Sequence, residues 1–291
     1  MRIRTLTLLA GAALGLASNL AGQDYQFQTI DPPRASSSQA KGVNPQGDIV
    51  GVTIDLAGEG HGFLYSAGVF TQIDVPNASF TNAVGINARG EIVGRWSDAQ
   101  GLSHGYVLSE GKFTLFDVPG CNLETTPHGI NNAGDIVGRC VDANGNMHAF
   151  RISGLQTTIF DIPGTLGTDA FRSTDEGDTV GYFIKGNGTA RAFSRTLSGH
   201  VRRFDYPGGI NSGARGINER FDVVGQFDTP SDSQTHGFTL IEGKFTQVDI
   251  RASLFTSISD INNRGVIVGD FVDKGGVDHA FVGRPRTSST W

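Results

Sequence analysis

A ten-residue pattern recurs six times along the chain, and its spacing constrains the fold more than any other feature of the sequence. The pattern is Gly-Ile-Asn-x-x-Gly-Asp-Ile-Val-Gly, and successive copies end 43 or 44 residues apart. The six copies span Gly42–Gly51, Gly85–Gly94, Gly129–Gly138, Arg172–Gly181, Gly216–Gly225 and Asp260–Gly269. A constant period of this length is typical of propellers and solenoids, in which every copy folds as one small unit.

Two further elements keep the same phase. A His-small-aromatic triplet follows each copy after ten or eleven residues, and it begins at His61, His104, His148, Arg191, His236 and His279. A short run that ends in aspartate, often with proline two residues later, completes the unit. These aspartates are Asp31, Asp74, Asp117, Asp161, Asp205 and Asp249.

Each unit therefore holds four short runs rich in Ile, Val, Phe and Thr, separated by turn residues such as Asn-x-x-Gly. This composition favours strands, and Asn and Gly favour tight turns. We predict an all-β fold, a six-bladed β-propeller built from four-stranded antiparallel blades. An open solenoid of stacked sheets is the alternative.

The two ends of the repeat array complement each other. The sixth unit stops after its third run, and a fourth run without a unit of its own lies at Phe27–Pro32. We therefore expect the N-terminal strand to complete the last blade and close the ring, which would remove an exposed sheet edge.

In its His-small-aromatic triplets and its ten-residue pattern, the chain resembles the extracellular HAF-repeat proteins. These are named for the His-Ala-Phe triplet, which occurs here at His148–Phe150 and His279–Phe281. The resemblance covers residues 24–291 and implies a propeller scaffold, but it assigns no activity. The fourth unit departs most, with Arg172 in place of glycine and Arg191 in place of histidine, and the fifth carries Phe221 at a turn glycine.

Residues 1–23 have the plan of a secretory signal peptide, with Arg2 and Arg4 before an apolar run at Leu6–Leu16. Gln23 stands where a lipoprotein would carry its lipidated cysteine, so we expect no lipid anchor and no membrane span. Residues 24–291 would then form one secreted, periplasmic or extracellular domain. The net charge of −6 and the lack of basic clusters argue against nucleic-acid binding.

The repeated residues have structural explanations. A ring of metal-ligating histidines is the alternative for His61, His104, His148, His236 and His279. Equivalent residues in a ring lie too far apart to share one ion, so we expect them to hydrogen-bond within their blades. The glycines that end each copy fall in mid-strand, where they mark close backbone approach. These are Gly51, Gly94, Gly138, Gly181, Gly225 and Gly269. We assign no catalytic residue, metal or cofactor.

The only two cysteines, Cys121 and Cys140, lie in the third unit. In an exported protein an even cysteine count favours a disulfide. A buried Cys140 with a free Cys121 is the alternative.

We expect a monomeric, non-catalytic scaffold that binds a protein, glycan or small molecule through the loops leading into each ten-residue pattern, where the copies diverge most. Four polar residues there stand outside the repeat consensus: Glu124, His128, Asn211 and Arg215. An enzyme, either a lactonase-like hydrolase or a polysaccharide-active enzyme, is the main alternative, and a surface-assembly module is another. Glu124, His128 and aspartates converging on a central cavity would favour the enzyme.

Overall fold

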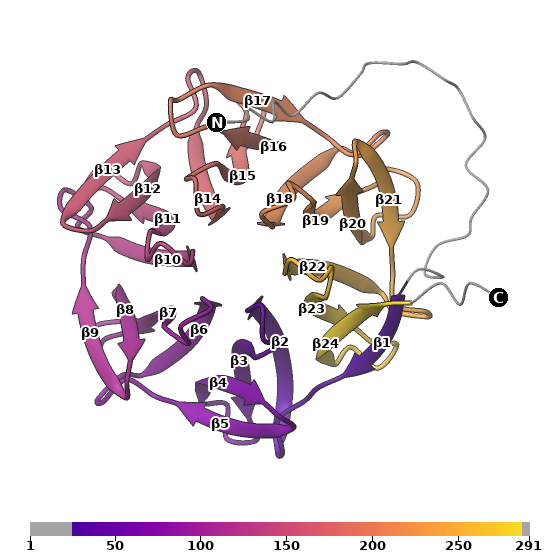
Figure 1. The fold of residues 1–291 in the computed structure, drawn as a ribbon, viewed down its shortest axis with the longest axis horizontal. Coiled ribbons are helices and arrows are strands. Elements are labelled where there is room, and N and C mark those ends of the chain that lie inside the picture. The colour runs from indigo at the N-terminus through magenta and orange to yellow at the C-terminus, as the bar shows by residue number, and fades with distance from the viewer. Residues whose placement is uncertain (1–24, 287–291) are drawn as a thin grey trace.

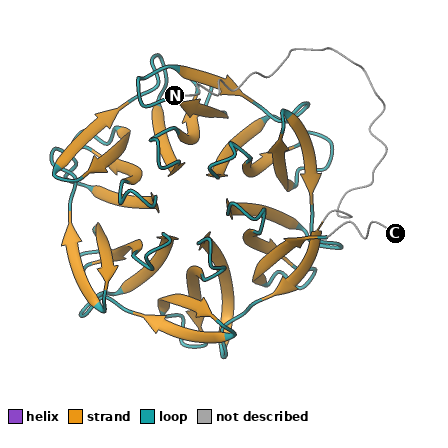
Figure 2. Ribbon diagram, viewed as in Figure 1, coloured by secondary structure: helices purple, strands orange, loops and turns teal. Residues whose placement is uncertain are grey.

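The protein forms a ring of strands around a central axis (Figures 1 and 2). The computed structural model describes residues 25–286, which contain 24 β-strands and no helix. None of these residues therefore belongs to a helix long and apolar enough to cross a membrane. The predicted signal peptide lies outside the described residues.

The strands fall into four rows from the axis outward, and one strand from each row makes a blade. The inner row is β2 (Ala35–Val43), β6 (Phe80–Ile86), β10 (Glu124–Ile130), β14 (Gly167–Ser173), β18 (Asn211–Ile217) and β22 (Phe255–Ile261). The second row is β3 (Ile49–Asp55), β7 (Ile92–Ser97), β11 (Ile136–Val141), β15 (Thr179–Ile184), β19 (Val223–Asp228) and β23 (Ile267–Val272). The third row is β4 (Gly60–Ser66), β8 (Ser103–Ser109), β12 (Met147–Ser153), β16 (Ala190–Arg195), β20 (Thr235–Ile241) and β24 (Asp278–Pro285). The outer row is β5 (Val69–Ile73), β9 (Lys112–Phe116), β13 (Gln156–Phe160), β17 (Val201–Phe204), β21 (Lys244–Val248) and β1 (Tyr25–Thr29).

We number the blades one to six from the blade that begins with β2. Within a blade, neighbouring strands pair antiparallel, as in the sheets β18-β19-β20-β21 and β1-β24-β23-β22. The other sixteen strands count as one sheet, because single parallel bridges such as Gly60↔Phe80 join the third strand of one blade to the inner strand of the next.

The first and last described strands lie side by side. β1 pairs with β24 from Tyr25↔Pro285 to Thr29↔Phe281, and the Ile30 amide donates to the Ala280 carbonyl at 2.9 Å. At the inner row, the Asn262 side-chain amide donates to the Asn44 carbonyl at 2.9 Å and so links blade six to blade one.

The repeated glycine of each second-row strand faces a β-bulge in the inner strand. In blade two the bulge falls between Ala83 and Gly85, opposite Gly94. A Cβ on Gly94 would lie 1.9 Å from the Asn82 carbonyl oxygen and 2.7 Å from the Tyr106 ring, so no side chain fits there. The same obstruction recurs at Gly51, Gly138, Gly181, Gly225 and Gly269.

The core lies between and within the blades, and each third-row strand supplies one large aromatic residue to it. Each of these rings is no more than 2% exposed and covers the glycine of the neighbouring second-row strand. They are Phe63, Tyr106, Phe150, Phe193, Phe238 and Phe281. Full burial of one such side chain stabilises a fold by roughly 1.5–3 kcal/mol.

The repeat histidines lie in the third row and contact the outer row. His104 Nδ1 lies 2.8 Å from an Asp117 carboxylate oxygen, and Nε2 lies 3.4 Å from Asp98 in the preceding turn. We call the six equivalent contacts the His–Asp ladder. Its members are His61–Asp74, His104–Asp117, His148–Asp161, Arg191–Asp205, His236–Asp249 and His279–Asp31. The arginine of blade four thus takes the place of a histidine within the same contact.

The predicted disulfide is confirmed: Cys121 is bonded to Cys140, with their Cα atoms 5.6 Å apart. The alternative of a free Cys121 is therefore wrong. The bond ties the loop that leads into β10 to strand β11.

Candidate functional site

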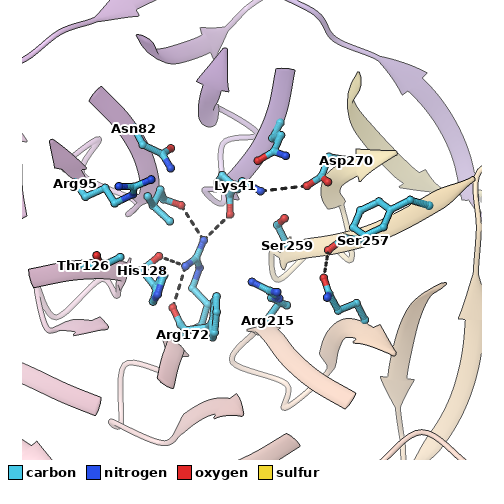
Figure 3. A pocket seen from close by; sticks show the side chains of 15 residues that line it. Lys41, Asn82, Arg95, Thr126, His128, Arg172, Arg215, Ser257, Ser259 and Asp270 are labelled. Atoms are coloured by element: carbon cyan, nitrogen blue, oxygen red, sulfur yellow. Dashed lines mark hydrogen bonds and ion pairs between the residues drawn. The ribbon is translucent and has the colours of Figure 1, made fainter. Parts of the chain in front are cut away.

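The bulges of the inner strands give the ring its axial cavity. Side chains of a regular strand alternate between the two faces of the sheet. A bulge inserts one extra residue and so interrupts this alternation by one side chain. The six side chains inserted opposite the repeated glycines line a cavity of about 260 Å³ on the axis (Figure 3). They are Lys41, Val84, His128, Phe171, Arg215 and Ser259.

The rest of the wall is mostly polar. The inner strands add side chains two residues before the bulge, and the second row adds the residue after its glycine. These are Gln39, Asn82, Thr126 and Ser257 from the inner row, and Arg95, Gln226 and Asp270 from the second row. Equivalent positions carry different residues in different blades, so the wall is chemically asymmetric although the backbone repeats.

Arg172 forms the floor of the cavity. It replaces the first glycine of the repeat, and its guanidinium reaches across the axis (Figure 3). Nη2 donates to the carbonyls of Lys41 at 2.6 Å and Val84 at 2.9 Å. Nη1 donates to the carbonyls of Phe171, at 2.9 Å, and His128. One side chain thereby satisfies backbone carbonyls from four blades.

Asp260 is the ion-pair partner of Arg172. It occupies the equivalent glycine position in blade six, and its Oδ2 lies 3.2 Å from Arg172 Nε. Both side chains are only 8% exposed. Asp260 also accepts the amides of Val43 at 3.1 Å and Ile261 at 3.0 Å. Burial raises the pKa of Asp260, against the opposing effect of Arg172 and these amides. The pair blocks the axis near the ends of the inner strands.

The cavity therefore opens toward the loops that lead into the inner strands. Phe255, the first residue of β22, lines its wall, whereas Arg172 is the second-last residue of β14. This is the face on which the sequence predicted binding.

A partly buried histidine at the wall contacts a buried carboxylate behind it. His128 Nε2 lies 3.1 Å from Asp169 Oδ1, and its ring stacks on Phe171 with centroids 4.3 Å apart. Burial lowers the pKa of His128. Burial would raise the pKa of Asp169, but His128 and Arg139, at 3.5 Å, hold it below its ordinary value. At neutral pH we therefore expect a neutral imidazole beside an ionised carboxylate.

Two guanidinium groups at the wall have no ion-pair partner within 4.0 Å among the described residues. Arg95 lies over the Phe80 ring at 4.8 Å, and Arg215 lies over the Phe171 ring at 4.5 Å. Arg215 Nε and Asn82 Oδ1 are buried without a hydrogen-bond partner in this part of the chain. Burial lowers the pKa of Arg95, yet a guanidinium stays charged at neutral pH. Unpaired buried polar groups are costly and need an explanation.

Two of the four residues proposed from sequence line the cavity. His128 and Arg215 do so, but they lie within strands β10 and β18 and not in loops, which corrects the expectation. These inner strands can carry polar residues because one of their faces lines a polar cavity.

The other two residues lie beside the cavity. Glu124 accepts from Thr126 Oγ1 at 2.7 Å and from Arg139 Nε at 2.9 Å. Asn211 accepts the Ala190 amide at 3.0 Å and donates to Asp228 at 2.9 Å, so it joins two blades.

Sequence reasoning missed Arg95, Asn82, Arg172 and Asp260. The last two carry a visible signal, because they replace a glycine that the other four units keep. Arg95 and Asn82 carry none, since neither position has a consensus residue among the six units.

A second hollow of about 560 Å³ lies between blades five and six, lined by Phe27, His236, Asp249, Arg251 and Phe255 among others. Its histidine and aspartate belong to the His–Asp ladder and are paired with each other. The axial cavity is therefore the stronger candidate. Within residues 25–286, no group of three or more His, Cys, Asp or Glu side chains is arranged to hold a metal ion.

Comparisons with known proteins bear on the fold. No family model matches the sequence, and no curated protein matches it significantly. The fold is similar to that of the fucose-specific lectin from Aleuria aurantia, with a TM-score of 0.54, 13% identity and coverage of 89% of this chain and 100% of the lectin. That lectin is described as a six-bladed β-propeller.

Two further solved structures are similar. TolB from Acinetobacter baumannii gives a TM-score of 0.59 at 15% identity, covering 87% of this chain and 65% of that chain. AofleA from Arthrobotrys oligospora gives 0.52 at 12% identity, covering 93% and 87%. Identities this low bear on the fold alone. The chain has the all-β fold of the six-bladed β-propellers.

Proposed function

We propose that this protein is an exported, non-catalytic β-propeller that binds a small polar ligand, of the glycan class, in its axial cavity. Three polar side chains at the wall carry the proposal. Arg215 Nε and Asn82 Oδ1 are buried without a hydrogen-bond partner among the described residues, and the Arg95 guanidinium there has no ion-pair partner within 4.0 Å. A ligand that hydrogen-bonds these groups would offset their desolvation. Ligand sites in proteins are concave, with a few convergent polar groups of this kind.

The scaffold belongs, in this proposal, to the HAF-repeat proteins and forms one monomeric domain over residues 24–291. The His–Asp ladder supports this assignment, because the triplet occupies the same place in all six blades. We infer a closed ring of six four-stranded blades, in which β1 completes blade six. The pairing of β1 with β24 supports closure, and the disulfide supports export to an oxidising compartment.

A thermal-shift screen of the exported chain against glycans and polar metabolites, with metal analysis of the same sample, tests the proposal. A ligand that binds only the folded state raises the melting temperature. Asn82→Ala should reduce that shift, because it removes one wall group. Asn187→Ala, in an exposed turn of blade four, should leave it unchanged. If no ligand shifts the melting temperature, or if Asn82→Ala has no effect on any shift, axial binding is wrong.

A hydrolase of the lactonase-like or polysaccharide-active kind is the second candidate, and the His128–Asp169 contact favours it. A neutral imidazole oriented by a buried carboxylate is a common general base. Glu124, however, is bonded to Arg139 outside the cavity wall. Turnover of lactone or glycoside substrates that is lost in His128→Gln would favour the enzyme. Binding without turnover would favour the scaffold.

A further inference from the structure

The charge at the axial wall is opposite in sign to that of the whole protein. The chain carries a net charge of −6. The wall carries the four cationic side chains Lys41, Arg95, Arg172 and Arg215, against the single carboxylate of Asp270. The carboxylates of Glu124 and Asp169 are not part of the lining, and both contact Arg139.

Two of these cations are neutralised within the protein. Lys41 Nζ lies 3.2 Å from Asp270, and Arg172 pairs with Asp260. Arg95 and Arg215 are the remaining two: the carboxylates that act on them electrostatically, Glu124 and Asp169, lie more than 4.0 Å away and pair with Arg139. Each is held against an aromatic ring, so its guanidinium is already oriented before a ligand arrives. A guanidinium matches the geometry of a carboxylate, to which it donates two parallel hydrogen bonds.

The two free guanidiniums stand on opposite sides of the axis. Arg95 comes from β7 in blade two and Arg215 from β18 in blade five, three blades apart in a ring of six. Figure 3 shows Arg172 between them in the view down the axis. A ligand that satisfies both therefore needs negative charge at two ends.

The wall between the two arginines bears amides and hydroxyls. Gln39, Asn82 and Gln226 offer amides, and Thr126, Ser257 and Ser259 offer hydroxyls. Such groups pair with ligand hydroxyls, which are both donors and acceptors. The volume of about 260 Å³ admits a small ligand and not a long chain.

We propose that the axial cavity binds an acidic sugar that carries two carboxylates, with Arg95 and Arg215 holding one carboxylate each and the amides and hydroxyls holding the hydroxyl groups between them. This inference rests on the proposed function, since it names the ligand class of the same cavity.

Calorimetric titration with a graded ligand series tests it. The series is galactarate with two carboxylates, galacturonate with one, galactose with none, and inorganic phosphate as a compact anion. Each carboxylate accepts charge-assisted hydrogen bonds from one guanidinium, so affinity should fall about tenfold or more with each carboxylate removed. Phosphate should bind more weakly than galactarate.

Three results would overturn the inference in distinguishable ways. If galactose binds as tightly as galactarate, the cavity is a glycan site but charge does not select the ligand. If phosphate binds most tightly, the site takes a compact anion. If no member of the series binds while the wider screen gives an axial ligand, the function stands and the ligand class is wrong. If the wider screen also gives none, both fail.

Variants of the two arginines sharpen the test. Arg95→Gln and Arg215→Gln should each weaken galactarate about tenfold and leave galactose affinity unchanged. Arg89→Gln is the matched control, because Arg89 is an exposed arginine of the same unit in the turn after β6. Arg215 acts electrostatically on buried Asp169, so we expect Arg215→Gln to lose stability. Arg95 acts on half-buried Glu124, which keeps Arg139 as its ion-pair partner in Arg95→Gln, and melting curves identify the folded samples of both variants. Unchanged galactarate affinity in folded Arg95→Gln contradicts the proposal.

Discussion

The outer half of each blade and the axis-facing wall are built from the same repeat, yet the ladder residues are nearly identical in all blades and the axial residues are not. The His–Asp ladder makes one contact six times, five times with histidine and once with arginine. The bulge position at the axis carries six different residues. A ladder contact lies within one blade, so the same pair suits every copy. Axial residues meet one another, so six copies of one charged residue would repel, and only departures from the repeat create a site.

Blade four contains both kinds of departure and separates them. Arg191 replaces a ladder histidine but still reaches the outer-row aspartate, with Nε 2.6 Å from Asp205. Arg172 replaces an axial glycine and creates a new element, the floor of the cavity. A substitution in the ladder exchanges one partner of the aspartate for another, whereas this substitution at the axis adds a contact that no other blade has.

Removing residues 24–33 should have the largest effect on the scaffold. It deletes β1 and exposes the edge of β24, and it removes the buried Tyr25 and Ile30 side chains. Each such burial is worth roughly 1.5–3 kcal/mol, so the melting temperature should drop strongly or folding should fail. Circular dichroism of residues 24–291 and of residues 34–291 measures the effect. An unchanged melting curve would show that β1 does not close the ring.

Arg172→Gly should have the next largest effect, although it restores the repeat consensus. It leaves Asp260 buried without its ion pair, and loss of one partner of a buried pair typically costs about 3–5 kcal/mol. Chemical denaturation gives the free energy of unfolding. The double variant Arg172→Gly/Asp260→Gly should recover most of the loss, because no charge is left unpaired. Equal stability of the wild type and the single variant would contradict the assigned floor.

His104→Ala tests the ladder and should cost about 1 kcal/mol, because the contact is partly exposed. Burial alone would lower the pKa of His104, but Asp117 and Asp98 raise it above its ordinary value. Because the pKa of His104 is higher in the folded protein than the value of about 6.5 in the unfolded chain, the protonated side chain stabilises the fold. This stabilisation is complete below about pH 6.5 and disappears as the pH rises through the pKa of the folded state. The melting-temperature gap between wild type and variant should therefore be larger at pH 6 than at pH 9. A gap that widens toward pH 9 would rule out the ion pair. The metal content of His104→Ala should equal that of the wild type.

Arg191→His should have the smallest effect. It restores the ladder consensus and keeps a partner for Asp205. Blade four carries Lys185 where the other turns carry the second aspartate, so the new histidine gains one carboxylate and not two. We expect a change within about 0.5 kcal/mol in unfolding free energy. A loss as large as that of Arg172→Gly would mean that the ladder and the axis do not differ as described.

The sequence predicted the scaffold because local periodicity encodes it. The period, the strand runs and the paired cysteines are all visible within one unit. The site was only half predicted, because it is assembled across units. Arg172 and Asp260 are 88 residues apart and meet only through the ring. The bulge also shifts the alternation by one residue, so a simple in-out pattern misassigns which side chains face the axis.

The most direct test of the account is a crystal structure of residues 24–291 grown with galactarate. The account predicts ligand density in the axial cavity above Arg172, with one carboxylate at Arg95 and the other at Arg215. Density between blades or on the outer ladder, with an empty axis, would contradict it.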